Sequence, residues 1–250
     1  MSHDKIKSAV RARMAETGEP YATARREVIR EHQSAGPAGR SPLASTAMLL
    51  WINGPSGVGK TATAFELNRR LPGSVVCEPE HVGYGMRRML PPPLRLGFWQ
   101  DIPAWRHSVL ELLRMTLAEH SGPVIVPMTL VNSAHFQEII GSLRSDGLAV
   151  HHFALLAEPA TVVRRLRARS LGREPRTQPW ELDVLDGWLE QLRRPEFAQH
   201  VRTDHRTVAE VADVISGAAG LTITPSADGP VRAWVHRYAT TVRSVRWLSG

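Results

Sequence analysis

The sequence predicts an α/β fold in which a parallel sheet carries helices on both faces. The first observation behind this prediction is the alternation of short apolar runs, typical of buried strands, with longer stretches of helical spacing. The second is a glycine-rich turn that joins the first apolar run to the helix after it. The 250 residues divide into an N-terminal helix pair (1–33), a linker (34–45), a main domain (46–224) and a C-terminal basic amphipathic helix (225–250).

The N-terminal segment is predicted to form two short helices, each with apolar residues on one face. These residues are Ile6, Val10 and Met14 in the first helix and Ala24 and Val28 in the second. Two helices of this length cannot enclose a sufficient core of their own. We therefore expect them to dock on the main domain, to pair with another copy or to bind a partner.

The main domain alternates predicted strands with predicted helices. The strands cover residues 48–52, 74–78, 123–128, 150–157 and 200–203. The helices cover residues 60–71, 81–90, 103–120, 134–146, 159–170, 180–192 and 208–218. Strands that alternate with helices are expected to pair in parallel, because a crossover helix returns the chain to the same end of the sheet.

The turn after the first strand contains a complete phosphate-binding motif. Gly54, Gly59, Lys60 and Thr61 match G-x-x-x-x-G-K-[ST] between a strand and a helix. Backbone N–H groups of such a turn and the helix N-terminus can surround a phosphate chain. We expect Lys60 to contact the β- and γ-phosphates of ATP and Thr61 to bind Mg²⁺. The predicted nucleotide site is Gly54, Pro55, Ser56, Gly57, Val58, Gly59, Lys60, Thr61 and Ala62.

Composition supports this interpretation and excludes other classes. Of the 31 basic residues only Lys5, Lys7 and Lys60 are lysines, so lysine is kept at the motif in an arginine-rich chain. The net charge of +7 comes mainly from the two flanks, so it does not predict specific nucleic-acid binding. A single cysteine, Cys77, and the lack of an apolar run of about 20 residues favour a cytoplasmic protein.

Two carboxylates, Glu78 and Glu80, follow the second predicted strand. Ligands of doubly wound sheets bind at the carboxyl ends of the strands. A carboxylate there can accept the proton of a substrate hydroxyl or hold Mg²⁺ through water. Glu80 is the first candidate for this base and Glu78 is the second.

An aromatic and polar segment, residues 98–106, has the composition of a small-molecule pocket. A uracil ring can stack on Trp99 or Trp105, and Arg106 can bind a phosphate or sugar oxygen. Either tryptophan is alternatively a core residue. The predicted substrate-binding residues are Trp99, Gln100, Asp101, Trp105, Arg106 and Thr129.

Arg165 and Arg169 lie four residues apart and share one face of a predicted helix. The stretch resembles the lid helix of nucleotide kinases, in which arginines neutralise the transferring phosphoryl group. That resemblance implies a catalytic role for both arginines. The alternative is an ordinary solvated run of charge.

Beyond these motifs, the chain resembles the tunicamycin-resistance proteins of bacteria, a branch of the P-loop kinases. The matching stretches are W-I-N-G-P-S-G-V-G-K-T-A-T-A-F-E-L (51–67), E-P-E-H-V-G (78–83), F-W-Q-D (98–101), W-R (105–106), V-I-V-P-M-T-L-V (124–131), F-Q-E-I-I-G-S-L-R (136–144) and V-H-H-F-A-L-L-A (150–157). The resemblance implies a P-loop NTPase fold of the nucleotide or small-molecule kinase type, ATP binding and resistance to a nucleoside antibiotic. Residues 1–44 are an addition to the core of that family.

Two function classes follow for this chain. The first is ATP-dependent phosphoryl transfer to a hydroxyl of a nucleoside-like small molecule, favoured by the paired glutamates and the lid arginines. The second is ATP-dependent binding and sequestration of a drug at the membrane surface without phosphoryl transfer. It is favoured because Met128 and Thr129 end the third strand where many P-loop NTPases carry an acidic Mg²⁺ partner.

The C-terminal segment, residues 225–250, has apolar residues at spacings of three and four, with arginines mostly on other faces. Such a helix can lie on an anionic membrane surface or pack its apolar stripe on the main domain. The first alternative implies peripheral contact with the inner face of the membrane, and the second implies a structural clasp.

Overall fold

The structure is a computed structural model that describes residues 3–34, 47–94, 97–169 and 182–226. The chain forms two compact units, Met1–Ser45 and Thr46–Gly250. All but the first two residues of the predicted C-terminal helix lie outside the described residues, so that helix stays a prediction.

The N-terminal unit contains two helices, α1 (His3–Thr17) and α2 (Tyr21–Ser34), where two helices are predicted. Val10, Ala24 and Val28 are buried against one another between these helices. Whether this helix pair docks on the main domain, pairs with another copy or binds a partner stays a prediction.

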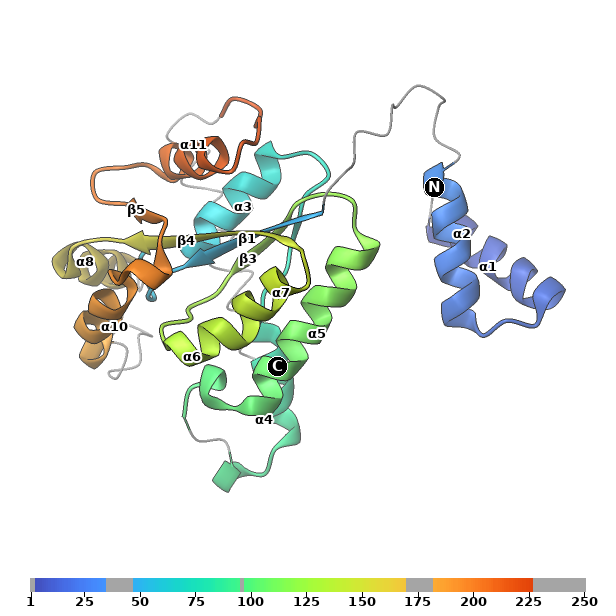
Figure 1. The fold of residues 1–250 in the computed structure, drawn as a ribbon, viewed down its shortest axis with the longest axis horizontal. Coiled ribbons are helices and arrows are strands. Elements are labelled where there is room, and N and C mark those ends of the chain that lie inside the picture. The colour runs from blue at the N-terminus through green and yellow to red at the C-terminus, as the bar shows by residue number, and fades with distance from the viewer. Residues whose placement is uncertain (1–2, 35–46, 95–96, 170–181, 227–250) are drawn as a thin grey trace. The chain divides into compact units, whose positions relative to one another are not determined.

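The main unit is built on a five-stranded sheet whose strands are all parallel, which confirms the predicted architecture (Figure 1). The strands are β1 (Met48–Asn53), β2 (Val75–Val76), β3 (Val124–Pro127), β4 (Ala149–Leu156) and β5 (His200–Arg202). Their order in the sheet is β2-β3-β1-β4-β5. β1 is therefore central, and its Trp51 lies in register with Val126 of β3 and His152 of β4.

Helices cover both faces of this sheet. They are α3 (Lys60–Arg70), α4 (Glu80–Met89), α5 (Pro103–Glu119), α6 (Ser133–Phe136), α7 (Ser142–Ser145), α8 (Pro159–Arg169), α10 (Leu185–Leu192) and α11 (Val208–Ala218). Short 3-10 turns cover Pro92–Leu94, Trp99–Asp101 and Pro195–Phe197. Helices α3 and α11 lie on one face, and α5 to α7 lie on the other (Figure 1). No helix within the described ranges is both long and apolar enough to cross a membrane.

Some element boundaries differ from the predictions. β2 is shorter than the predicted strand, because Pro79 has no N–H to extend the ladder beyond the Cys77 N–H, which donates to Ile125 at 2.9 Å. The helix predicted over 134–146 is interrupted by a π-helical turn, Gln137–Gly141, between α6 and α7.

The strand before the phosphate-binding motif forms the centre of the core. Leu49, Leu50, Trp51 and Ile52 have no exposed surface, as expected for a parallel strand buried on both faces. At the far end of α3, the Arg70 and Thr224 backbones meet: the Thr224 N–H donates to the Arg70 carbonyl at 2.9 Å. The Arg70 guanidinium donates back to the Thr224 carbonyl at 2.7 Å, which fixes the last described stretch of the chain on α3.

Candidate functional site

The phosphate-binding motif lies at the carboxyl edge of the sheet. Because all five strands run in the same direction, the turns after β1, β2 and β3 share this edge. The turn after β1 holds the motif, the turn after β2 holds Glu78 and Glu80, and the loop after β3 holds Thr129. The topology therefore assembles at one edge three groups that are far apart in the sequence.

The glycines of the motif have backbone conformations that other residues rarely adopt. Gly54, Gly57 and Gly59 have φ values of +143°, +82° and +114°. A Cβ atom on Gly54 would lie 2.6 Å from Val58 Cγ1, and one on Gly57 would lie 2.8 Å from Leu166 Cγ. A Cβ atom on Gly59 would meet no atom of the described chain within 4 Å, so this side of the loop is open to a phosphate.

Lys60 and Thr61 follow the loop directly and form the start of α3. Lys60 is 8% exposed, and its Nζ donates to the Pro55 carbonyl at 3.1 Å, which holds the ammonium against the loop. The first N–H groups of α3 add partial positive charge at the same place. An ammonium, a helix N-terminus and an open glycine loop fit a nucleotide phosphate chain.

Asn53, fully buried at the end of β1, is the centre of a hydrogen-bond network at the base of the loop. Its Oδ1 accepts the N–H of Gly54 at 2.8 Å and the N–H of Leu130 at 2.9 Å. Its Nδ2 donates to the Leu130 carbonyl at 2.7 Å and lies 3.1 Å from Nε2 of His152. Burial lowers the pKa of His152 to about 4, so the imidazole is neutral near pH 7 and Nε2 can accept. This network could not be predicted, because a single sequence does not show which distant residues face an asparagine.

Thr129 supports the phosphate-binding loop. It is buried, and its Oγ1 donates to the Gly54 carbonyl at 2.7 Å. Its hydroxyl proton is used within the protein, and a contact of Thr129 with substrate stays a prediction. No group of three His, Cys, Asp or Glu side chains suited to a metal occurs in the described part of the chain.

The two predicted carboxylates lie near one hydroxyl group. Glu80 begins α4, and the Tyr84 hydroxyl donates to Glu80 Oε2 at 3.4 Å. The pKa of Tyr84 is raised, first by burial and then by the negative charges of Glu80 and Glu78. Both carboxylates therefore stay candidates for the base. Tyr84 was not predicted, although its position four residues after Glu80 places both side chains on one helix face.

The two tryptophans of segment 98–106 have different environments. Trp105 is 0% exposed, and its Nε1 donates to the Pro79 carbonyl at 3.1 Å. It is a core residue that holds the turn between Glu78 and Glu80, so the prediction that a substrate ring stacks on it is corrected. Trp99 is partly exposed, and its ring meets the Tyr84 ring edge to face at a centroid distance of 4.7 Å.

Arg106 is bound to protein partners. Its Nε pairs with Glu138 Oε2 at 2.5 Å, and its Nη1 donates to the Gln100 carbonyl at 2.7 Å. The buried guanidinium is therefore already paired within the protein, and a contact of Arg106 with a phosphate or sugar oxygen stays a prediction. Gln100 is buried beside it and Asp101 is exposed.

Arg165 braces the phosphate-binding loop from α8. Its Nη1 donates to the Val58 carbonyl at 3.1 Å and to Thr203 Oγ1 at 2.9 Å, and its Nη2 donates to the Thr203 carbonyl at 2.7 Å. Burial lowers the pKa of Arg165, but these acceptors compensate for the desolvation of its charge. Arg169 is the last residue of α8, and its side chain lies outside the described part.

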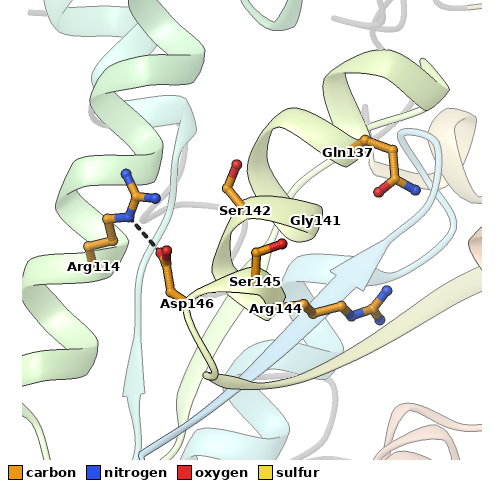
Figure 2. A pocket seen from close by; sticks show the side chains of 7 residues that line it. All are labelled: Arg114, Gln137, Gly141, Ser142, Arg144, Ser145 and Asp146. Atoms are coloured by element: carbon orange, nitrogen blue, oxygen red, sulfur yellow. Dashed lines mark hydrogen bonds and ion pairs between the residues drawn. The ribbon is translucent and has the colours of Figure 1, made fainter.

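A surface hollow lies beside α5, the π-helical turn and α7 (Figure 2). It is lined by Arg114, Gln137, Gly141, Ser142, Arg144, Ser145 and Asp146. Asp146 precedes the first residue of β4, so its end of the hollow lies toward the amino edge of the sheet. Arg114, one of the two arginines that line the hollow, is paired with Asp146 at 2.8 Å and with Glu111 at 2.7 Å. The open glycine loop and the buried Lys60 lie at the motif, so we place the candidate site there and not in this hollow.

Comparison with known proteins gives the following matches. The family described as an AAA domain matches residues 49–195. The tunicamycin resistance protein of Deinococcus radiodurans is 33% identical with a TM-score of 0.61, and the match covers 72% of this chain and 100% of that chain. The APS kinase of Mycobacterium tuberculosis, solved with AMPPNP and APS, is 20% identical with a TM-score of 0.50, covering 70% of this chain and 98% of that one. A sugar kinase of a Janibacter species is 16% identical with a TM-score of 0.50, and the match covers 71% of this chain and 96% of that chain. No curated protein sequence matches the chain significantly.

These matches agree with the geometry of the site. The two kinases share the fold alone at their level of identity, and that fold is the P-loop kinase type. The Deinococcus protein is matched over its whole length, and the AAA-domain match covers more than half of this chain. The chain therefore belongs to the tunicamycin-resistance protein family of P-loop, kinase-like AAA-domain proteins.

Proposed function

We propose that the protein transfers the terminal phosphoryl group of ATP to a hydroxyl of a nucleoside-like small molecule of the tunicamycin type. The observation that carries this proposal is the joint position of the Lys60 loop and the Glu78–Glu80 turn at one edge of the sheet. A protein that only binds ATP needs the Lys60 loop, which holds the phosphates. A phosphotransferase also needs a proton acceptor, such as a carboxylate of the Glu78–Glu80 turn.

ATP with Mg²⁺ supplies the transferable phosphoryl group and a cation that neutralises its charge. The residues that would hold it are the open glycine loop, Lys60 and the hydroxyl of Thr61 in the first turn of α3. Lys60 would exchange its bond to the Pro55 carbonyl for the phosphate oxygens, which are stronger acceptors because they are charged. Arg165 and Thr129 keep the loop in shape from two sides through the Val58 and Gly54 carbonyls.

Glu80 is our first candidate for the general base. Tyr84 already donates to one of its oxygens, which orients the carboxylate and leaves the other oxygen to accept a substrate proton. Glu78 is the second candidate, because it also acts on Tyr84 through its charge. Trp99, beside Tyr84, is the remaining aromatic candidate for a contact with the substrate ring.

The test is mass spectrometry of tunicamycin after incubation with the protein, ATP and Mg²⁺. Transfer predicts a mass gain of one phosphate group that is lost in Lys60→Ala. An unchanged mass with retained binding of both ligands would contradict the enzymatic proposal.

A second function, ATP-dependent binding and sequestration of the drug without transfer, is favoured by one observation. Thr129, at the position of the usual acidic Mg²⁺ partner, is bound to the Gly54 carbonyl. Under this function the same experiment gives binding without mass gain. Contact of residues 225–250 with an anionic membrane surface belongs to this alternative, and it is a proposal from the sequence alone.

A further inference from the structure

A second polar cluster borders the proposed site and takes no part in the phosphate-binding loop. Its members are Gln100, Asp101, Arg106, His135 and Glu138, and we refer to them as the Gln100–His135 cluster. Arg106 follows Trp105, whose indole is bonded to the Pro79 carbonyl between the two candidate bases. His135 lies in α6, directly after the loop that carries Thr129. The cluster is thus joined on two sides to the carboxyl edge of the sheet.

Two polar atoms of this cluster are buried without a hydrogen-bond partner among the described residues. One is Oε1 of Gln100, a side chain that is only 6% exposed. The other is Nδ1 of His135, whose contact with Asp101 Oδ1 at 3.8 Å is too long for a hydrogen bond. Buried polar groups nearly always have a partner, so each exception needs an explanation. A bound ligand that donates to Gln100 Oε1 and contacts His135 Nδ1 would supply the missing partners.

The charges of the cluster indicate what kind of ligand it suits. Its fixed charges are one guanidinium, Arg106, and two carboxylates, Asp101 and Glu138, and the guanidinium is paired with Glu138 at 2.5 Å. Burial and then the charge of Arg106 lower the pKa of His135, so the imidazole is neutral near pH 7. With no spare positive charge, the cluster disfavours an anion. The acceptor oxygen of Gln100 instead requires a donor, such as O–H or N–H.

We propose that Gln100 and His135 form the subsite for the acceptor substrate and take a neutral group with hydrogen-bond donors, such as sugar hydroxyls or an imide N–H, in preference to an anionic group. This inference rests on the proposed function, since it names the part of the acceptor that the same site recognises. Gln100 Oε1 accepts from the ligand, and His135 Nδ1 makes a second polar contact. Arg106 is a positioning residue, because its bond to the Gln100 carbonyl fixes the backbone from which that side chain extends.

The first test needs no ligand. Gln100→Leu replaces an unpartnered acceptor by an apolar side chain of similar size, so the melting temperature of the free protein is expected to stay equal or to rise. Gln137→Leu is the matched control, because Gln137 is an exposed glutamine in the same part of the main unit. A melting temperature several degrees lower for Gln100→Leu than for the control would overturn the inference, since Gln100 would then have a structural partner.

The second test is calorimetry on full-length protein saturated with AMPPNP and Mg²⁺. The neutral probes are tunicamycin and uridine, and the anionic probe is uridine 5′-monophosphate. We expect a neutral probe to bind and Gln100→Leu or His135→Asn to weaken it by about tenfold or more, with AMPPNP affinity unchanged. His107→Asn, which changes an exposed histidine on α5, should have no effect. Tighter binding of the monophosphate than of uridine, or equal affinities in the variants and parent, would overturn the inference.

The outcomes separate this inference from the proposed function. If a neutral probe binds through Gln100 but gains no phosphate, the subsite stands and the proposed transfer fails. If uridine binds and tunicamycin does not, the subsite stands and the proposed substrate is wrong. If neither neutral probe binds to the AMPPNP-loaded protein, the subsite is overturned while the phosphate site is unaffected.

Discussion

His152 is a buried histidine whose neutral ring holds Asn53, and we predict that acid destabilises the protein through this residue. The Asn53 amide can place its oxygen toward Gly54 and Leu130 only if its Nδ2 faces acceptors. One of these acceptors is His152 Nε2 at 3.1 Å, and Nδ1 of the same ring lies 3.4 Å from the Ala198 carbonyl. A proton on Nε2 would oppose the Asn53 N–H, so protonation must disturb the base of the phosphate-binding loop.

The magnitude follows from the shift in the pKa of His152. Its pKa is about 4 in the folded protein and 6.5 in the unfolded chain. Between these values the unfolded state binds more protons, so the free energy of unfolding falls as the pH falls. The contribution is fully present above pH 6.5 and is lost progressively toward pH 4. The difference between the folded and unfolded pKa values of His152 corresponds to about 3 kcal/mol in the free energy of unfolding.

The assay is urea denaturation from pH 7 to pH 4 with His152→Gln as the reference variant. The glutamine oxygen can accept from Asn53 in place of Nε2 but does not titrate in this range. Between pH 7 and pH 4 the parent should lose about 3 kcal/mol of unfolding free energy relative to the variant. The variant is therefore favoured at low pH. A difference that is independent of pH would refute the reasoning, because it would place the His152 pKa near its ordinary value.

Four further predictions concern the site and the flank. Lys60→Ala should lower nucleotide affinity by about tenfold to a hundredfold in calorimetry without changing the melting temperature by more than a few degrees, because the lysine contacts ligand while the backbone shapes the loop. Glu80→Gln should keep ATP binding but lower the transfer rate by about a hundredfold or more, because an amide cannot accept the hydroxyl proton; an unaffected rate would move the role to Glu78. Arg165→Leu should lower the unfolding free energy by about 1–3 kcal/mol, because the Val58 and Thr203 carbonyls lose a donor, and an equal free energy in denaturation would contradict the bracing role. Deletion of residues 229–250 leaves the Thr224 contacts in place and should weaken sedimentation with anionic vesicles at low salt, whereas a lower melting temperature with no vesicle binding by the full chain would favour the docked helix.

The sheet and the phosphate-binding motif could be predicted because their signals are local in the sequence. The apolar run 48–52 and the motif after it require only their own residues and spacing. Parallel pairing then followed from alternation with helices. The carboxyl-edge position of Glu78 and Glu80 was predictable for the same reason, since it depends on which element each residue follows and not on a distant partner.

The roles of the remaining site residues depend on distant partners and could not be predicted in this way. Trp105 resembles a stacking platform in sequence, but the Pro79 carbonyl and the core around it decide its position. Arg106 and Arg165 both carry the charge that a phosphate needs, yet each is bound to groups at least 30 residues away in the chain, Glu138 and Thr203. Thr129 was predicted to bind substrate, and only the structure shows that its hydroxyl donates to the Gly54 carbonyl.

The most direct test of the central claim is the mass of tunicamycin after incubation with the protein, ATP and Mg²⁺, with Lys60→Ala and Glu80→Gln measured in parallel. Phosphoryl transfer predicts one added phosphate group with the parent protein, none with Lys60→Ala, and a much slower gain with Glu80→Gln. A tunicamycin mass that stays unchanged with the parent protein, under conditions in which calorimetry shows both ligands bound, would contradict the claim that the Lys60 loop and the Glu78–Glu80 turn form a phosphotransferase site.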